Sequence, residues 1–190
     1  INPYGETKLI GEWMMADAEK AWGLRWAGLR YFNVAGAGWD DLGDMATLNL
    51  IPMVLDRLSK GETPKIFGTD YPTPDGTCVR DYIHVKDLAG AHIAALDYLA
   101  GGQDMAEHIF NVGTGQGASV REVVSKVIAS TGLDLEPEEL ARRAGDPPQL
   151  IGNATRIGEV LGWKAEHDLD DIVTSSYTSW QADPNRPHFG

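Results

Sequence analysis

The sequence predicts an α/β fold, because helical segments alternate along it with short apolar segments that have the character of buried strands. Residues 4–22 are good helix formers that end at Gly23, and residues 25–32 then have the aromatic and apolar composition of a strand. Residues 81–112 repeat the alternation as strand, helix and strand. Such a chain is expected to build a sheet with helices packed against it.

Local signals place the ends of several elements. Asn2 can cap the first helix and Pro3 suits its first position, while Asp87 can cap a helix at residues 88–99. The remaining expected elements are helices at 48–58, 120–131, 155–161 and 169–180, strands at 65–67, 81–85 and 109–112, loops at 36–44 and 70–76, and a frayed tail at 183–190.

The overall composition limits the classes of function. With 28 acidic and 16 basic residues the formal net charge is -12 at pH 7, and an acidic surface repels nucleic acid and anionic membranes. No apolar run approaches the ~18 residues that a membrane span needs. Cys78 is the only cysteine, so no intrachain disulfide can form and a cytoplasmic location is expected. The histidines are scattered, and no metal site is expected.

Tyr4 and Lys8 are four residues apart in the first expected helix, so their side chains share one face of it. An ordinary tyrosine, with a pKa near ~10, is a poor base at neutral pH. A nearby ammonium and the positive end of a helix dipole both stabilise a phenolate, which can then accept a proton from a hydroxyl. By itself this spacing is common, and it more often reflects an aromatic ring packed against a surface lysine.

Longer motifs around this pair resemble a known superfamily. Residues 2–9 (NPYGETKL), followed by residues 29–33 (LRYFN), are similar to the extended short-chain dehydrogenase/reductases. Residues 66–77 (IFGTDYPTPDGT), which run on into residues 79–88 (VRDYIHVKDL), resemble the UDP-glucose 4-epimerase branch of that superfamily. The resemblance extends over nearly the whole chain, and chance agreement of several ordered motifs is very rare.

The resemblance implies the carboxy-terminal part of a longer enzyme. Residues 1–33 and 81–112 would be the remaining part of a Rossmann-type NAD-binding domain, and residues 34–80 and 113–190 a smaller mixed α/β domain that binds the nucleotide sugar. The glycine-rich loop that holds the NAD pyrophosphate in the family would lie upstream of Ile1. We therefore expect the isolated chain to bind no NAD and to be inactive.

The resemblance also assigns the residues around the cofactor NAD. Tyr4 corresponds to the acid/base at the sugar 4-hydroxyl, and Lys8 to the lysine that binds the nicotinamide ribose and stabilises the phenolate. Tyr31 and Phe32 would line the nicotinamide end, and Asn33 would hydrogen-bond the substrate. Without the resemblance, at least one of these two aromatic residues would be taken for ordinary strand core.

For the uridine diphosphate end, the resemblance implies a larger set of contacts. Arg80 and Arg143 would clamp the diphosphate, because guanidinium matches phosphate in a bidentate manner. Leu150 stands where the family varies between tyrosine and a small residue, which leaves the acceptance of N-acetylated sugars open. The other expected contacts are Asn49 and Leu50 at a helix start beside the diphosphate, Lys65, Ile66 and Phe67 beside uracil, and Asp146 at the ribose hydroxyls.

The segment from Gly113 to Ala118 (GTGQGA) also fits the pattern of a dinucleotide-binding loop. It follows an expected strand and opens an expected helix, and Asp134 and Glu136 stand about twenty residues further on. The segment after Thr131, however, is acidic and contains proline, and it shows no buried strand–helix–strand run. A tight glycine turn between strand and helix is the preferred interpretation.

Two classes of function remain. The resemblance favours an NAD-dependent isomerase of galactose metabolism that epimerises C4 of a UDP-hexose, UDP-glucose or UDP-galactose, through a 4-keto intermediate. A dehydratase or decarboxylase of the same superfamily is the alternative enzyme, and a non-catalytic fragment that binds nucleotide sugars is the other class. The expected partner is a UDP-sugar, with no nucleic acid and no membrane, and the full-length form is expected to be a homodimer.

Overall fold

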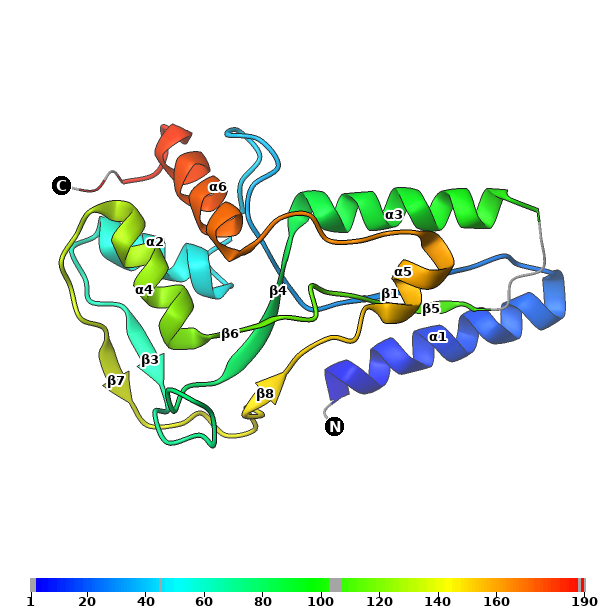
Figure 1. The fold of residues 1–190 in the computed structure, drawn as a ribbon, viewed down its shortest axis with the longest axis horizontal. Helices are drawn as coiled ribbons and strands as arrows, with labels where there is room; N and C mark the ends of the chain where they lie inside the picture. Colours follow the sequence, from blue (N-terminus) through cyan, green and yellow to red (C-terminus); the bar gives the residue numbers. More distant parts are fainter. Residues whose placement is uncertain (1–2, 45, 103–106, 188, 190) are drawn as a thin grey trace.

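Parallel strands lie at the centre of the structure, as the alternation of helix and strand predicts (Figure 1). The computed structural model describes residues 3–44, 46–102, 107–187 and 189. In chain order the elements are α1 (Pro3–Trp22), β1 (Gly28–Tyr31), β2 (Asn33–Ala35), α2 (Leu50–Ser59), β3 (Lys65–Phe67), β4 (Val79–His84), α3 (Val85–Ala100), β5 (Ile109–Val112), β6 (Gly117–Ser119), α4 (Val120–Thr131), β7 (Glu138–Leu140), β8 (Gln149–Leu150), α5 (Thr155–Leu161) and α6 (Leu169–Ala182).

The strand expected at residues 25–32 is shorter, β1 at residues 28–31, and a second short strand with a different neighbour, β2, follows it at residues 33–35. β1 pairs in parallel with β5, and β2, which begins after Phe32, pairs in parallel with β4. The first pair begins only at Gly28, because the chain before it runs past the end of α3, where Arg25 Nε donates to the Leu99 carbonyl at 2.8 Å. An apolar run indicates that a segment is buried, but not which strand each of its residues pairs with. Asn2, the expected cap, lies outside the described residues.

β4 belongs to two parts of the structure. Residues 82–84 pair with β2, whereas residues 79–81 pair antiparallel with β6 and residues 79–80 pair in parallel with β8. The sequence predicts neither of these two partners, nor β7, which pairs in parallel with β3. Two or three residues are too few to show an alternating pattern, so such strands are defined by the neighbour that they meet.

Two hydrophobic cores meet at β4. Tyr82 belongs to the larger core, in which α2, α4 and α6 pack together, and the next residue, Ile83, belongs to the smaller core with α3 and β5. Successive residues of a strand face opposite sides, so β4 separates the two cores. Ile157 brings α5 into the smaller core with residues 81–112, although the sequence division assigns it to residues 113–190. Periodicity reveals an apolar face but not which core covers it.

The cap of α3 is His84 and not Asp87, because β4 runs directly into the helix. His84 Nδ1 accepts a hydrogen bond from the Lys86 amide at 3.0 Å, and its Nε2 lies 3.0 Å from Ser175 Oγ on α6. The His84 ring stacks on that of His167 at 4.3 Å. Asp87 is buried within the first turn and pairs with His167 Nδ1 at 2.8 Å. A chain of side-chain contacts therefore joins α3 to α6.

The described residues of the tail are packed, although the composition predicts a frayed end. Trp180 Nε1 donates to the Pro187 carbonyl at 3.2 Å, and the Arg186 guanidinium lies over the Trp180 ring at 4.2 Å. The rings of Tyr177 and Phe189 are 5.5 Å apart. Proline and glycine weaken regular structure, but these aromatic contacts anchor the segment against α6.

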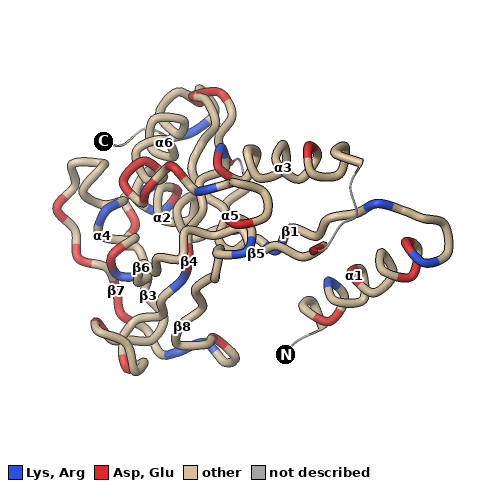
Figure 2. Tube along the Cα trace, turned by 45° about the vertical axis from the view of Figure 1, so that its right-hand side comes forward, with Lys and Arg blue, Asp and Glu red and all other residues tan. Residues whose placement is uncertain are grey.

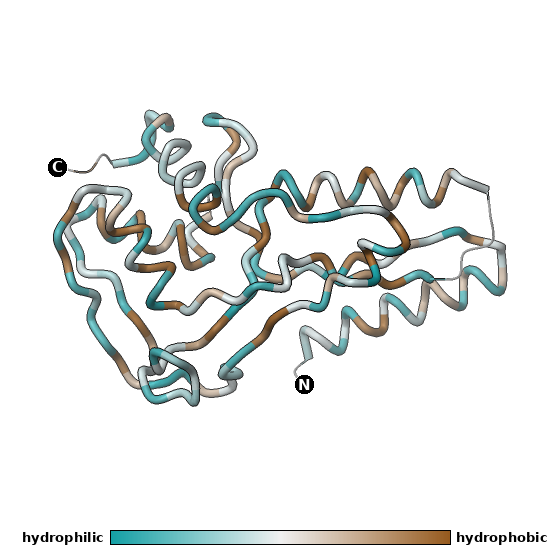
Figure 3. The backbone as a smooth tube through the Cα atoms, viewed as in Figure 1, coloured by the Kyte–Doolittle hydropathy of each residue, from teal (hydrophilic) through white to brown (hydrophobic). Residues whose placement is uncertain are grey.

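α1 runs along the edge of the structure (Figure 1) and carries hydrophobic residues along its length (Figure 3). Many of them are exposed. Trp13 is 59% exposed and Trp22 is 82% exposed. One of its links to β1 is polar: Arg30 Nε donates to Glu12 at 2.6 Å. Large apolar side chains exposed together on one helix are often covered by another part of a protein or by a partner. No helix in the described part of the chain is long and apolar enough to cross a membrane.

We predict that acid destabilises this fold through His84. Burial lowers the pKa of His84 first of all; His167 and Lys86 lower it further, whereas Asp87 and Asp171 raise it. As the pH falls below the ordinary value of ~6.5, the unfolded chain takes up this proton before the folded chain does. The free energy of unfolding should therefore be highest above that pH and should decrease below it. Denaturant titrations from about pH 7.5 to about pH 5 measure this dependence.

The matched variants are His84→Asn and His92→Asn. Asparagine can still cap α3 but does not titrate, so His84→Asn should lower stability at neutral pH and reduce its dependence on pH. His92 is an exposed residue of the same helix, with its Nδ1 2.8 Å from the Leu88 carbonyl, and its replacement is the control for loss of an imidazole. An unreduced dependence in His84→Asn would contradict the prediction.

Candidate functional site

Tyr4, Lys8 and Tyr31 line an open hollow of about 750 Å³ between α1 and β1. Tyr4 lies in the first turn of α1, and Lys8 follows one turn later with its Nζ 5.2 Å from the centre of the Tyr4 ring. The Tyr4 side chain is 72% exposed and that of Tyr31 is 55% exposed, so a ligand can reach both rings. The structure thus brings the predicted catalytic pair and one predicted cofactor residue to the same hollow.

Phe32 does not line this hollow, although the sequence predicts it beside Tyr31. Neighbouring residues of an extended chain face opposite sides, and the Phe32 ring lies against the backbone of Gly113 and Gly152. A Cβ atom would lie 3.2 Å from the ring at Gly113 and 2.4 Å from it at Gly152. Phe32 therefore forms a wall behind the strand and backs the site without entering the hollow.

A second, smaller cavity of about 40 Å³ is lined by Asn33, Asn49 and Leu50, three of the predicted substrate residues. Asn49 Nδ2 donates to Asp44 Oδ2 at 2.8 Å, and its side chain makes no capping hydrogen bond to α2. The first amides of α2 therefore have no side-chain cap and suit an anion. Tyr82 also lines the cavity, and burial raises the pKa of its phenol to about 12, so it remains protonated.

Arg80 and Arg143 converge on Asp146. The Arg80 Nη2 is 3.7 Å from Asp146 Oδ1, and Arg143 Nη2 and Nε are each 3.1 Å from Asp146 Oδ2. Arg80 is held in place because its Nη1 donates to the carbonyls of Val79 and Pro147, both at 2.9 Å. Two guanidinium groups share one carboxylate, so the cluster keeps positive charge and N–H donors for a further anion.

β3, the strand predicted to lie beside uracil, contributes Phe67 to this arginine cluster, whereas Lys65 pairs with β7. The Phe67 ring centre is 5.1 Å from Arg143 Cζ, and Lys65 Nζ is 3.6 Å from Glu138 on β7. Ile66 lies between them and is fully buried in the larger core. Its side chain therefore cannot contact a ligand, and only its backbone remains available at the strand.

Leu150 and Arg142 flank the same cluster. Leu150 is exposed on β8 and pairs in register with Arg80, which places the predicted gate residue beside the clamp. Arg142 is not predicted in the site, but it bonds with Asp70 and lies over the Tyr71 ring at 4.2 Å. Nothing in the sequence distinguishes Arg142 from its neighbour Arg143, because only the path of the chain decides which way each one faces.

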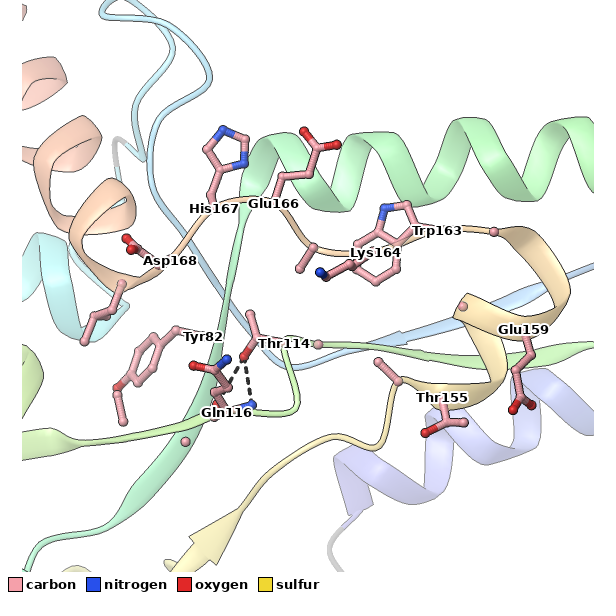
Figure 4. A pocket seen from close by; sticks show the side chains of 18 of the residues that line it. Tyr82, Thr114, Gln116, Thr155, Glu159, Trp163, Lys164, Glu166, His167 and Asp168 are labelled. Carbon is pink, nitrogen blue, oxygen red and sulfur yellow. Dashed lines mark hydrogen bonds between the residues drawn. The ribbon is translucent and has the colours of Figure 1, made fainter.

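A groove of about 710 Å³ lies elsewhere, between the loop at residues 113–118, α5 and the segment before α6 (Figure 4). Its charged residues include Glu159, Glu166 and Asp168 against Lys164, so it would repel a phosphate group. None of the predicted site residues lines this groove. Acidic positions are spread over most elements (Figure 2), and Arg80 and Arg143 bring two basic groups to Asp146.

The sequence matches the family model described as the NAD dependent epimerase/dehydratase family over residues 1–113. This chain belongs to that family. Its epimerase relatives include a UDP-glucose 4-epimerase of Azospirillum brasilense, to which it is 49% identical over 185 residues, or 95% of this chain and 53% of the relative. The chain spans about half the length of the curated relatives it matches.

Solved epimerase structures share the fold. The UDP-glucose 4-epimerase from Brucella ovis in complex with NAD is 44% identical, with a TM-score of 0.85 over 93% of this chain and 56% of that chain. The enzyme from Bifidobacterium longum in complex with NAD+ and UDP is 38% identical, with a TM-score of 0.83 over 97% of this chain and 56% of that chain. These likenesses confirm the predicted α/β fold with a Rossmann-type sheet.

We predict that Gly152→Ala disturbs the wall formed by Phe32. The added Cβ would lie 2.4 Å from Phe32 Cε2, so the ring must move, and such overpacking costs about 1–3 kcal/mol of unfolding free energy. Gly158→Ala in α5 is the matched control, because the nearest atom to its Cβ is 3.6 Å away and alanine favours helix by about 1 kcal/mol. Denaturant titration should show a loss only for Gly152→Ala, and equal stabilities would show that Phe32 does not sit there.

Proposed function

We propose that a full-length protein carrying this chain interconverts UDP-glucose and UDP-galactose by epimerisation at C4. The observation that carries the proposal is the placement of Tyr4, Lys8 and Tyr31 around one hollow, with Asn33 next on that side of the strand. An acid/base tyrosine beside an ammonium suits proton transfer at a sugar hydroxyl. The similarity to UDP-glucose 4-epimerases supports the same reaction.

The residues of this chain fit one end of NAD. The hollow beside Tyr4 can take the nicotinamide and its ribose, with the Lys8 ammonium as donor to the ribose hydroxyls and Tyr31 along the ring. The glycine loop at residues 113–118 cannot hold the pyrophosphate, because its amides are already bonded to Asp81. When bound, NAD would supply reversible acceptance of a hydride.

In this arrangement Tyr4 takes the proton of the sugar 4-hydroxyl. The positive charge of Lys8, 5.2 Å from the ring centre, stabilises the phenolate, and the start of α1 adds the positive end of a helix dipole. Asn33 orients the sugar by hydrogen bonding. With the O4 proton on Tyr4 and the C4 hydride taken by NAD, which would be its acceptor, the sugar becomes a 4-keto intermediate. After this intermediate rotates in the site, the hydride would return to the other face of C4 and Tyr4 would return the proton to O4.

The UDP half of the substrate is proposed to bind around β3, β4 and the start of α2. Arg80 and Arg143 contact the diphosphate, since Asp146 uses only part of their hydrogen-bonding capacity. The other proposed contacts are Asn49 and Leu50 at the diphosphate, Lys65, the Ile66 backbone and Phe67 beside uracil, Asp146 at the ribose, and Leu150 at the sugar.

We also propose the division into a cofactor part, residues 1–33 and 81–112, and a substrate part, residues 34–80 and 113–190. It is supported by the change of partner within β4 and by the two cores, with α5 as the exception. The exposed apolar face of α1 supports a homodimer of the full-length form, and the buried, unpaired Cys78 supports a cytoplasmic location.

We predict that Tyr4→Phe in the full-length protein abolishes the interconversion of UDP-glucose and UDP-galactose. Loss of general acid/base catalysis lowers the rate by about 10²–10⁴-fold, whereas the NAD content should stay unchanged. Tyr177→Phe is the matched control, because it removes a hydroxyl that only accepts from Gln181 on α6 at 2.7 Å. A coupled assay for UDP-glucose measures both, and near-normal turnover in Tyr4→Phe would disprove the assignment.

For residues 1–190 by themselves, a second function is favoured by the exposed apolar face of α1 and by the half-length match: a nucleotide-sugar-binding fragment without turnover. We predict that the isolated chain retains no NAD, because its glycine loop is filled by Asp81. The measurement is the absorbance of cofactor released on denaturation, with a full-length form as the control. Stoichiometric NAD in the isolated chain would contradict the prediction and would identify residues 113–118 as a cofactor loop.

A further inference from the structure

The carboxylate of Asp81 is fully buried at the point where β4 changes partners, and no ion pair with it is seen in the described residues. Its Oδ1 accepts from the Thr114 amide at 2.9 Å and from the Thr114 hydroxyl at 2.8 Å. Its Oδ2 accepts from the amides of Gly115 at 3.1 Å and Gly152 at 3.0 Å. These four donors occupy the acceptor positions of both oxygen atoms.

This geometry explains the glycine pattern at residues 113–118. The successive amides of Thr114 and Gly115 point at one carboxylate, as the amides of phosphate-binding loops point at phosphate. A Cβ on Gly113 would lie 2.6 Å from Asp81 Oδ2, so the close approach requires glycine. The Thr114 hydroxyl oxygen also accepts from the Gln116 amide at 3.1 Å (Figure 4). The loop is therefore an anion site whose anion belongs to the same chain.

Asp81 thereby holds the wall behind the site. The glycine loop and Gly152 are separate segments, and both lie against the Phe32 ring. Phe32 stands between Tyr31 and Asn33, the residues that line the two cavities. If the carboxylate released either segment, the ring would gain room to move, and the strand on either side of it would move as well.

The arginine cluster is held by other contacts. The position of the Arg80 side chain is fixed by its hydrogen bonds to the Val79 and Pro147 carbonyls and by its ion pair with Asp146. None of these contacts involves Asp81. Side chains of neighbouring strand residues face opposite sides, so the buried carboxylate and the arginine do not meet. A change at Asp81 should therefore reach the Tyr31–Asn33 end of the site first.

We infer that Asp81 is a positioning residue for the sugar and nicotinamide end of the site, an inference that rests on the proposed function. It acts through the glycine loop, Gly152 and Phe32, and not through the diphosphate clamp. Its negative charge is compensated by amide and hydroxyl donors, so an uncharged residue of the same shape cannot replace it: one of its two terminal atoms would present N–H groups to other N–H groups.

The test is Asp81→Asn in the full-length protein. We expect kcat for epimerisation to fall by about tenfold or more, because the wall is displaced at the reacting end. We expect the Kd for UDP, which is proposed to bind at the arginine cluster, β3 and the start of α2, to stay within about threefold, and the NAD content to stay stoichiometric. Steady-state kinetics, calorimetric titration of UDP and cofactor absorbance give the three readouts.

Two further variants bracket the result. Thr114→Val removes only one of the four donors, so kcat should fall in the same direction by less, and this variant carries the test if Asp81→Asn does not fold. Asp75→Asn is the control, because Asp75 is also a hydrogen-bonded carboxylate but lies in the loop before β4. It accepts from the Thr77 amide at 2.9 Å, from the Thr77 hydroxyl at 2.8 Å and from the Ser119 hydroxyl. It should leave kcat unchanged.

The outcomes separate the two proposals. If the unaltered full-length protein does not epimerise UDP-sugars, the proposed function is wrong, whatever the variants do. If it does, but Asp81→Asn and Thr114→Val lose only thermal stability at unchanged kcat, Asp81 has a purely structural role and the inference is overturned. A loss of UDP affinity as large as the loss of kcat would also overturn it, because the effect would then pass through the clamp.

Discussion

The structure depends on the way one strand, β4, is shared between two cores. Tyr82 faces the larger core and Ile83 the smaller, and the strand exchanges its neighbours after Asp81. A buried carboxylate at such a point would destabilise the fold by several kcal/mol if it lacked partners, and four hydrogen-bond donors remove this cost. The contacts that satisfy one side chain therefore also fix where the two parts of the molecule meet.

The electrostatics show how an acidic chain can bind an acidic ligand. A net charge of -12 acts over the whole surface, but salt screens it beyond about 8 Å in physiological solution. Arg80 is only 13% exposed and shares Asp146 with Arg143, so the local charge is positive where the diphosphate is proposed to bind. The acidic groove beside α5 has the opposite character, and size alone does not identify a binding site.

Much of the candidate site could be predicted because ordered motifs carry both identity and spacing. Tyr4 and Lys8 meet as their helical spacing predicts, and Asn33, Asn49 and Leu50 share one cavity. Two of the predicted residues have side chains that face away from the cavities. Phe32 faces the glycine loop and Ile66 faces the core, since alternate residues of a strand point in opposite directions. The contacts of Asp81 and Arg142 could not be predicted from local sequence, because their partners lie more than thirty positions away.

By itself, the sequence determined the alternation of helix and strand, the family and the spacing that brings Tyr4 and Lys8 together, because each of these is recorded in local composition or in short motifs. Only the tertiary structure decided which neighbour each strand takes, which core receives α5, and that the loop at residues 113–118 binds the carboxylate of Asp81. The physical reason is that periodicity records burial, whereas the partner in a contact is chosen by packing between segments far apart in the chain.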